Sequence, residues 1–390
     1  MECDCSGRSE VNDSTMKIIF VSHASSLTGA PKVVFELAKI FASRHQVIFA
    51  TKKDGPLLQQ AMQDNPEGIK YFNINNSHEV RLSPFQEKVE TAKAFISEHQ
   101  PDLVYVNSVA SGEWVVASRL CGVKNIFHVH EMRDECLSLL RVRCATLDIM
   151  NYVDLLVCVS QDVERDVRYF FDSMPPACTI VDHFFDCEKI QLRSQVEESL
   201  PKNAKGGIIS RNRPIICACG VASDRKGTDI FFDTAIRLPQ IQFLWIGKWN
   251  STDISHNPVE QRYEREKLDN FFISGEVTNP YFYLNLADLF VLCSREDPQP
   301  LIVFEALILG KPAVCFSHAG GSKFILDKFG YVLHGEASID RLVSLIDGLF
   351  PSTGDRFVPG WLTGVQKSML DRYDKGGVLP KFEQLIESLK

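Results

Sequence analysis

The sequence predicts an α/β protein with two doubly wound, Rossmann-like domains that face a central cleft. Apolar strand-like runs alternate with amphipathic helical segments from Met16 onward, and a polar stretch at residues 189–213 interrupts this alternation. The same order of strand, loop and helix starts again at Pro214. A length of 390 residues also exceeds one typical core and favours two or three domains.

The first half begins with a strand at Lys17–Val21, a loop, and a helix at Val33–Ser43 whose apolar residues share one face. Strands that alternate with crossover helices predict a parallel sheet covered on both faces. Further strands are expected at Gln46–Ala50, Asp102–Asn107, Asn125–Val129, Asp154–Ser160 and Thr179–Asp182, and further helices at Pro84–Glu98 and Gln161–Phe171.

The second half opens with a buried strand at Pro214–Cys219, a loop at Gly220–Gly227 and a helix at Thr228–Leu238. More strands are expected at Phe243–Ile246, Phe271–Ile273, Leu289–Cys293 and Ala313–Phe316. Two such domains leave a cleft at the carboxyl ends of their strands, where open α/β sheets bind ligands. The predicted plan is a flexible N-terminus (1–15), an N-terminal domain (16–188), a linker (189–213), a C-terminal domain (214–365) and a helical segment (366–390) that can pack back on the N-terminal domain.

Composition excludes several classes of protein. The net charge is −8 and the basic residues are scattered, so nucleic acid is not an expected partner. Residues 1–15 lack the apolar core of a signal peptide, and no apolar segment approaches the roughly 20 residues that span a bilayer. We therefore expect a cytoplasmic protein whose contact with membranes is at most peripheral.

The twelve cysteines indicate a reducing compartment rather than disulfides. Five of them lie in apolar strand-like runs, where a free cysteine acts as a small hydrophobe: Cys158, Cys217, Cys219, Cys293 and Cys315. The close pairs Cys3-x-Cys5 and Cys217-x-Cys219 do not make a zinc finger, so we expect no metal.

Glu305 is the one carboxylate in the apolar run Leu301–Gly310. Burying an ionised carboxylate is costly unless another group hydrogen-bonds it, so Glu305 should meet a partner or a ligand. Two interpretations compete: a buried salt bridge to an arginine or lysine, and hydrogen bonds accepted from the hydroxyl groups of a sugar or ribose.

Asp297 stands just before this run, in a segment with two prolines. It is predicted to cap a helix whose first residue is Pro298. Because Pro298 and Pro300 have no N–H, the backbone N–H groups of Gln299 and Leu301 would face the cleft.

Both halves carry a turn suited to an anion between their first strand and helix. In Asp224–Gly227, the backbone N–H groups and the positive end of the following helix favour an anion. Arg225 and Lys226 add positive charge that suits a diphosphate. The alternative is a solvated turn. The matching loop of the first half is Ser22–Pro31, in which Gly29 permits close backbone approach.

His128 and His130 follow a strand, and alternation places them on the same side. Three interpretations compete: a metal pair, which needs further ligands; a structural histidine at the rim of the sheet, chiefly for His128; and a group that touches the reacting substrate, for which His130 is the better placed.

Taken together, these segments resemble retaining glycosyltransferases of family 4, which have the GT-B fold. The resemblance runs from about Met16 to Lys390, and its most specific stretch is Asn279–Pro312, which is similar to the family's motif of two carboxylates eight positions apart, here Asp297 and Glu305. Asp297 stands where the family more often has Glu, and Val221 where an Arg often follows the glycine.

The resemblance implies a transferase that moves a hexose or deoxyhexose, with retention, from a nucleoside diphosphate sugar to a glycan or glycolipid acceptor. Fixed positive groups, rather than a metal or another cofactor, would stabilise the leaving diphosphate. It implies these roles: Lys226 and Arg225 at the diphosphate; Glu305 at the ribose; Asp297 with the N–H groups of Gln299 and Leu301 at the sugar and phosphate; His130 at the sugar; Gly29 near the phosphates.

Two alternatives stay open at this point. One is a catalytically weak GT-B protein that acts as a glycan-binding or scaffold module. The other is a different GT-B chemistry, such as that of a sugar-nucleotide epimerase or a phosphorylase.

Overall fold

The structure is a computed structural model that describes residues 15–26, 29–64, 69–74, 85–133, 135–136, 147–171, 175, 177–249, 257–335, 337–351, 360 and 362–389. The pair Cys3 and Cys5, and Pro84 at the start of a predicted helix, lie outside these residues. Among the described residues, no helix combines the length and the apolar character needed to cross a bilayer.

The chain divides into two compact units. Unit 1 contains Met1–Val129, Leu137–Val157 and Phe171–Cys178. Unit 2 contains His130–Cys136, Cys158–Phe170 and Thr179–Lys390. Short segments from the first half of the chain, including His130, therefore group with the C-terminal half.

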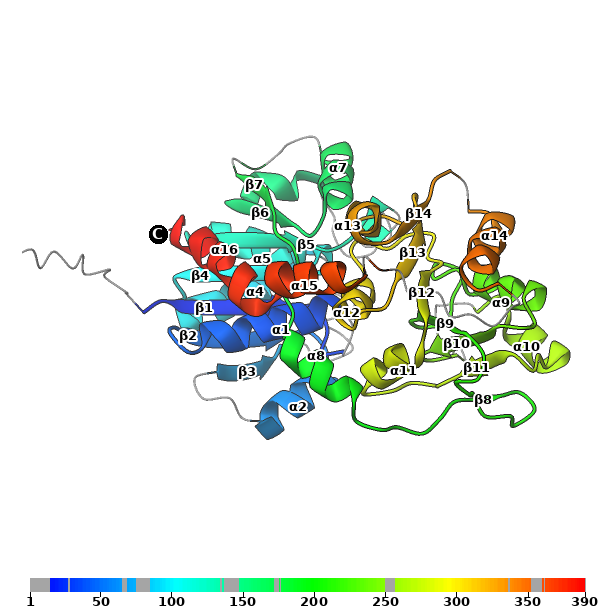
Figure 1. Ribbon diagram of the computed structural model, residues 1–390. Helices are drawn as coiled ribbons and strands as arrows, with labels where there is room; N and C mark the ends of the chain where they lie inside the picture. The colour runs from blue at the N-terminus through cyan, green and yellow to red at the C-terminus, as the bar shows by residue number, and fades with distance from the viewer. Residues whose placement is uncertain are drawn as a thin grey trace, which may run out of the picture. The chain divides into compact units, whose positions relative to one another are not determined.

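Within the described residues the first sheet has seven strands, and its first strand in the chain lies between the second and the fourth. The pairings among β1, β2, β3, β4 and β5 are parallel, as the sequence predicts. In spatial order the strands are β3 (Ile69–Asn73), β2 (Gln46–Thr51), β1 (Lys17–Ser22), β4 (Leu103–Asn107), β5 (Lys124–Val129), β6 (Leu155–Cys158) and β7 (Cys178–Ile180) (Figure 1). The accompanying helices are α1 (Gly29–Phe41), α2 (Pro56–Asp64), α4 (Phe85–His99), α5 (Gly112–Leu120) and α7 (Gln161–Phe170), with 3₁₀ turns at Val109–Ser111 and Leu147–Tyr152.

The second sheet also has seven strands and repeats this order around β9. Its strands in spatial order are β14 (Tyr331–Leu333), β13 (Ala313–Phe316), β12 (Leu289–Leu292), β9 (Ile215–Cys219), β10 (Gln242–Ile246), β11 (Phe271–Ile273) and β8 (Lys202–Asn203). The described strands of this sheet pair in parallel, except that β8 runs antiparallel to β11 at the edge. The predicted class of two Rossmann-like sheets is thus confirmed.

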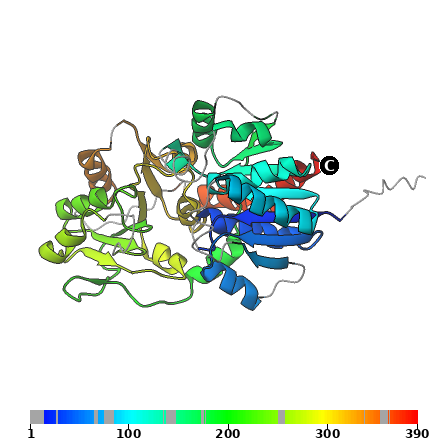
Figure 2. The ribbon, with the colours of Figure 1, turned by 180° about the vertical axis from the view of Figure 1, so that it is seen from behind.

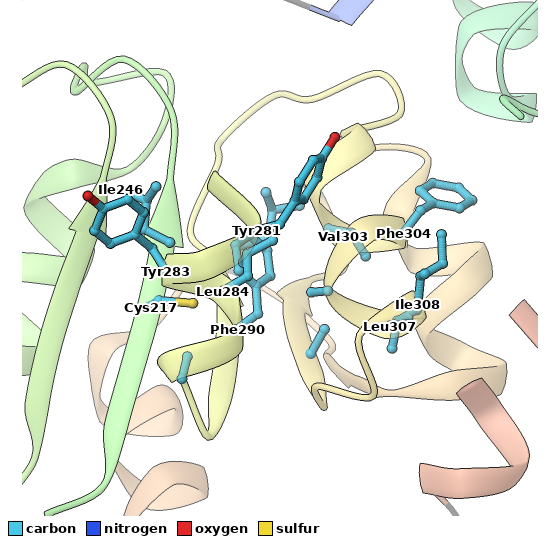
Figure 3. Packing of buried hydrophobic residues seen from close by; sticks show 14 of the residues in the cluster. Cys217, Ile246, Tyr281, Tyr283, Leu284, Phe290, Val303, Phe304, Leu307 and Ile308 are labelled. Atoms are coloured by element: carbon cyan, nitrogen blue, oxygen red, sulfur yellow. The ribbon is translucent and has the colours of Figure 1, made fainter. Parts of the chain in front are cut away.

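Helices cover both faces of the second sheet, as Figure 2 shows from behind. One hydrophobic cluster joins the sheet to α9 (Thr228–Arg237), α10 (Glu260–Glu266) and α14 (Ile339–Leu349). The other joins it to α8 (Cys187–Ser194), α11 (Pro280–Leu286), α12 (Leu301–Ile308), α13 (Ser322–Phe329) and α15 (Leu362–Tyr373). The last helix is α16 (Lys375–Glu387). Figure 3 shows residues of the second cluster, where Tyr281 on α11 lies near Val303 on α12.

The segment predicted as a linker contains regular structure. The helix α8 extends to Ser194 and is capped by Asp186, whose side chain accepts a hydrogen bond from the N–H of Lys189 at 3.0 Å. Strand β8 adds to the second sheet, and Ile209 is buried. The polar composition of residues 189–213 predicted a linker or a long surface excursion, and the segment contains the end of α8 and the two-residue strand β8.

The five cysteines expected to be free are free. Burial raises the pKa of the Cys217 and Cys293 thiols well above the ordinary value, so these side chains stay neutral within the apolar core.

Candidate active site

The turn between β9 and α9 depends on a glycine. Gly227 has φ 65° and ψ 35°, in the left-handed region, and precedes the first residue of α9. A Cβ at this position would lie 2.0 Å from the carbonyl oxygen of Cys293. Only glycine therefore fits both the conformation and the space.

Arg295 fixes the same turn from the loop after β12. Its guanidinium donates two hydrogen bonds to the Asp229 carboxylate, at 2.9 and 2.7 Å, and one to the carbonyl oxygen of Asp224 at 2.6 Å. Burial alone would raise the pKa of Asp229, but the hydrogen bonds and charge of Arg295, with help from backbone N–H groups, hold it below its ordinary value. Arg295 thus links the turn after β9 to the loop after the neighbouring strand β12.

Lys226 and Asp297 meet directly. The Lys226 Nζ donates to the Asp297 carboxylate at 2.5 Å, and the hydroxyl of Ser294 donates to the same carboxylate oxygen at 3.2 Å. The Asp297 side chain is 8% exposed and that of Lys226 18% exposed. The structure therefore brings together two of the residues predicted for the site, as an ion pair that solvent screens only partly.

Asp297 does not cap a helix, contrary to the sequence prediction. Helix α12 begins at Leu301, and the residue before it is Pro300, in an extended conformation with φ −68° and ψ 115°. The ring of each proline disfavours helical geometry in the preceding residue, so Pro298 and Pro300 keep Asp297 and Gln299 out of the helix. The N–H of Gln299 therefore precedes the helix instead of belonging to its first turn.

Glu305 is buried on α12 and 4% exposed. The hydroxyl of Tyr281 on α11 donates a hydrogen bond to its Oε1 at 3.2 Å. Burial raises the pKa of the nearby Cys219 thiol to about 12; the charge of Glu305 adds to this effect, and that of Lys226 opposes it. Glu305 on α12 and Lys226 in the turn therefore both act electrostatically on the buried thiol of Cys219.

A glycine-rich segment at His318–Ser322 packs against Asp297. The N–H of Asp297 donates to the carbonyl oxygen of Ala319 at 2.8 Å, and the N–H of Gly321 donates to that of Pro298 at 3.1 Å. A Cβ on Gly320, where φ is 103°, would lie 2.2 Å from the carbonyl oxygen of Asp297. The backbone around Asp297 is therefore held on both sides.

His130 follows β5 and is 8% exposed. Its ring stacks on that of His183, with centroids 5.7 Å apart and planes 17° apart. His128, by contrast, is buried in unit 1, where its Nδ1 pairs with the hydroxyl of Tyr105 at 2.8 Å, as a structural histidine would. No group of three His, Cys, Asp or Glu side chains among the described residues is arranged to hold a metal ion.

Three further predicted residues occupy varied settings. Arg225 is exposed, and its guanidinium donates to the carbonyl oxygen of Glu296 at 2.9 Å. Leu301 is half-buried at the start of α12. Gly29 is the exposed first residue of α1 and belongs to unit 1, whereas the other predicted site residues belong to unit 2.

The sequence of the chain matches two known protein families. The family described as Glycosyltransferase Family 4 matches residues 27–189, and the family described as Glycosyl transferases group 1 matches residues 201–353. The chain thus carries a Family 4 domain followed by a group 1 domain, both of glycosyltransferase families, and has the GT-B type of fold. The first match covers the first sheet from β2 onward, and the second covers the second sheet and contains the turn at Lys226, the Asp297 segment and Glu305.

Individual relatives are distant. An uncharacterized glycosyltransferase of Methanocaldococcus jannaschii is 22% identical over 201 residues, which are 48% of this chain and 48% of that protein. The alpha-galactosylglucosyldiacylglycerol synthase of Streptococcus pneumoniae is 28% identical over 131 residues, which are 33% of this chain and 34% of the synthase. The matched region thus spans about half of one curated relative and about a third of the other.

Solved structures share the fold over nearly the whole chain. Anabaena HepE, in complex with UDP-glucose, has a TM-score of 0.72 at 19% identity and covers 96% of this chain and 100% of its own. A sucrose-phosphate synthase from Thermosynechococcus elongatus has a TM-score of 0.73 at 14% identity and covers 96% of this chain and 99% of its own.

Several contacts of the candidate site were not anticipated from the sequence. They involve Tyr281, Ser294, Arg295, Gly320 and His183. The glycine pair after β13 carries a usable signal, since glycines after a parallel strand mark close backbone approach. The other four residues meet the site only through tertiary contacts.

Proposed function

We propose that this glycosyltransferase moves a hexose or deoxyhexose from a nucleoside diphosphate sugar to a glycan or glycolipid acceptor, with retention of configuration. The observation that carries the proposal is the ion pair of Lys226 and Asp297 in the segments that follow β9 and β12, with the buried carboxylate of Glu305 on the next helix, α12, of the same unit. Groups of this kind at that edge of a parallel sheet are typical of a ligand site.

The donor is assigned from the chemistry of these side chains. Lys226 exchanges its contact with Asp297 for one with the diphosphate, and the exposed Arg225 adds a second positive charge. Glu305, already bonded to one hydroxyl, accepts hydrogen bonds from the ribose. HepE, of the same fold, has been solved with UDP-glucose, which makes uridine diphosphate sugars the first donors to test.

The transfer itself follows from where charge develops. The acceptor oxygen forms a bond to the anomeric carbon on the face that the diphosphate leaves, and the breaking carbon–oxygen bond gives its electron pair to the diphosphate. The acceptor's hydroxyl proton passes to a diphosphate oxygen. Lys226 and Arg225 stabilise the growing negative charge in place of a divalent metal, while Asp297 and His130 hold the sugar. The N–H groups of Gln299 and Leu301 assist Asp297.

The acceptor and the compartment are proposed on narrower grounds. The name of the pneumococcal relative, a synthase of a galactosylglucosyl lipid, supports a glycolipid acceptor, and contact with a membrane would then be peripheral. Gly29, in the corresponding turn of unit 1, is assigned to the donor phosphates. The buried free thiols support a reducing compartment, for which we propose the cytoplasm.

A product assay tests the proposal. The protein is incubated with each nucleoside diphosphate sugar, with and without a panel of glycan and glycolipid acceptors, with EDTA present throughout. Free nucleoside diphosphate that appears only with acceptor, together with an α-linked product from an α-linked donor, supports the reaction. An isomerised donor or inversion would overturn it, and activity that EDTA abolishes would overturn the metal-free mechanism.

A further inference from the structure

His183 makes the most informative contact that the assigned roles leave unexplained. It is 4% exposed, and its ring stacks on that of His130 at 5.7 Å and 17°. Two aromatic rings that lie this nearly parallel restrict each other's rotation about the Cα–Cβ and Cβ–Cγ bonds.

The backbone of Gln299 fixes the ring of His183. Nδ1 of His183 has no hydrogen-bond partner among the described residues, so the hydrogen bond between His183 and the backbone of Gln299 involves Nε2. This bond favours a proton on the ring, so Nε2–H donates to the carbonyl oxygen of Gln299. Burial, the larger effect, lowers the pKa of His183 to about 4, which leaves the ring neutral at physiological pH with Nδ1 bare.

These contacts join two parts of the candidate site. Gln299 lies two residues after Asp297, in the segment that the prolines hold extended. Its side-chain Nε2 also donates to Asp182, the residue before His183, at 3.4 Å. Two hydrogen bonds therefore tie Asp182 and His183 to the Asp297 segment, and the stacked ring continues the connection to His130.

We propose that His183 is a positioning residue for transfer. Its neutral ring is anchored on the carbonyl oxygen of Gln299 and keeps the ring of His130 in a fixed position relative to Asp297. The inference rests on the proposed function, in which His130 and Asp297 contact the sugar. A neutral ring suits this role because a cation stacked on His130 would change the charge beside the reacting sugar.

The test uses the full chain with three variants. His183→Leu removes both the stack and the hydrogen bond, and His183→Phe keeps the stack but removes the N–H donor. His45→Leu is the matched control, because His45 stacks on Phe41 in unit 1 with the same spacing of 5.7 Å and angle of 17°. We expect His183→Leu to lower kcat about 10- to 100-fold with the donor KM within about twofold, since misplacement of a reacting group costs turnover more than binding. His183→Phe should fall between it and the wild type, and His45→Leu should match the wild type.

A second measurement does not depend on activity. In ¹⁵N-histidine-labelled protein, the ring signals of His130, assigned with His130→Ala, should shift in His183→Leu and stay near their wild-type positions in His45→Leu. Equal kcat in His183→Leu and wild type, or unmoved His130 signals, would overturn the inference. A wild-type protein without transfer activity would contradict the proposed function instead, and the His130 signals would still decide the role of His183.

Discussion

The turn after β1 in unit 1 and the corresponding turn after β9 in unit 2 differ sharply, although six strands of each sheet follow the same order. In unit 2 this turn carries Arg225 and Lys226 and is bound by Arg295. In unit 1 the described part of the turn carries hydroxyls, and Ser25 pairs with Thr51 at 2.8 Å. The same topological position thus offers charge in one unit and neutral hydrogen bonds in the other, which shows that the fold provides a location and the side chains provide its chemistry.

Each unit also holds a lysine after a strand, paired with a buried carboxylate. Lys226 pairs with Asp297, and Lys52, after β2, pairs with Glu113, which is 3% exposed. Lys52 also donates a hydrogen bond to the carbonyl oxygen of Ala110 at 2.7 Å. Its ammonium group therefore has two partners within unit 1, the Glu113 carboxylate and this carbonyl oxygen. We infer that the pair in unit 1 is structural and that the pair in unit 2 opens for a ligand.

Gly227→Ala should show the largest effect. The new Cβ would meet the Cys293 carbonyl oxygen in a left-handed conformation, so the turn cannot keep its shape. We expect donor binding to weaken at least about 100-fold and the free energy of unfolding to fall by about 2–4 kcal/mol. Gly122→Ala is the control, because Gly122 has a similar φ of 71° with nothing within 4 Å. Calorimetry and urea unfolding measure both; equal losses in the two variants would show that close packing at Gly227 is unimportant.

Exchanging the lysines for alanine separates the two pairs. Lys226→Ala should lower kcat/KM for the donor about 100-fold, because its contact to the diphosphate strengthens as charge develops. Lys52→Ala should leave that ratio nearly unchanged but cost about 3–5 kcal/mol of stability, because Glu113 stays buried without its partner. Steady-state kinetics and denaturant titration check this, and a reversed pattern would exchange the roles of the two units.

Glu305→Gln keeps the shape of the side chain and removes its charge. Each lost charge-assisted hydrogen bond is worth about 1.5–3 kcal/mol, so donor efficiency should fall by about one to two orders of magnitude. Circular dichroism should remain unchanged. Wild-type kinetics would mean that the charge of Glu305 serves the fold, where Tyr281 donates to it, and not the donor.

Arg295→Gln should have the smallest effect, a change in the pH dependence of stability. A depressed pKa of Asp229 contributes stability that is present above its unfolded value, 3.8, and is lost as pH falls through the folded value. Without Arg295 this contribution, less than about 1 kcal/mol because solvent screens both side chains, should disappear. Urea unfolding from pH 7 down into acid should show a wild-type advantage that is full above pH 3.8 and shrinks as pH falls through the lower pKa of folded Asp229. An advantage that does not change with pH would contradict the role of the charge pair.

Much of the fold follows from local pattern. Apolar runs such as Lys17–Val21 and Ala313–Phe316 locate central strands because those strands are buried on both faces. The polar composition of residues 189–213 did not reveal that this segment contains the end of α8 and the short strand β8. The pairing of Lys226 with Asp297 agrees with a shared site, but the stack of His130 on His183 joins residues far apart in sequence, which no spacing predicts. Pro298 and Pro300 did contain the signal against a cap at Asp297, because proline restricts the residue before it.

A crystal structure of the protein with a nucleoside diphosphate sugar tests the central claim most directly. We expect a diphosphate oxygen within hydrogen-bond distance of Lys226 Nζ and a ribose hydroxyl that donates a hydrogen bond to the Glu305 carboxylate. A donor bound to unit 1 alone, with the Lys226–Asp297 pair intact, would contradict it.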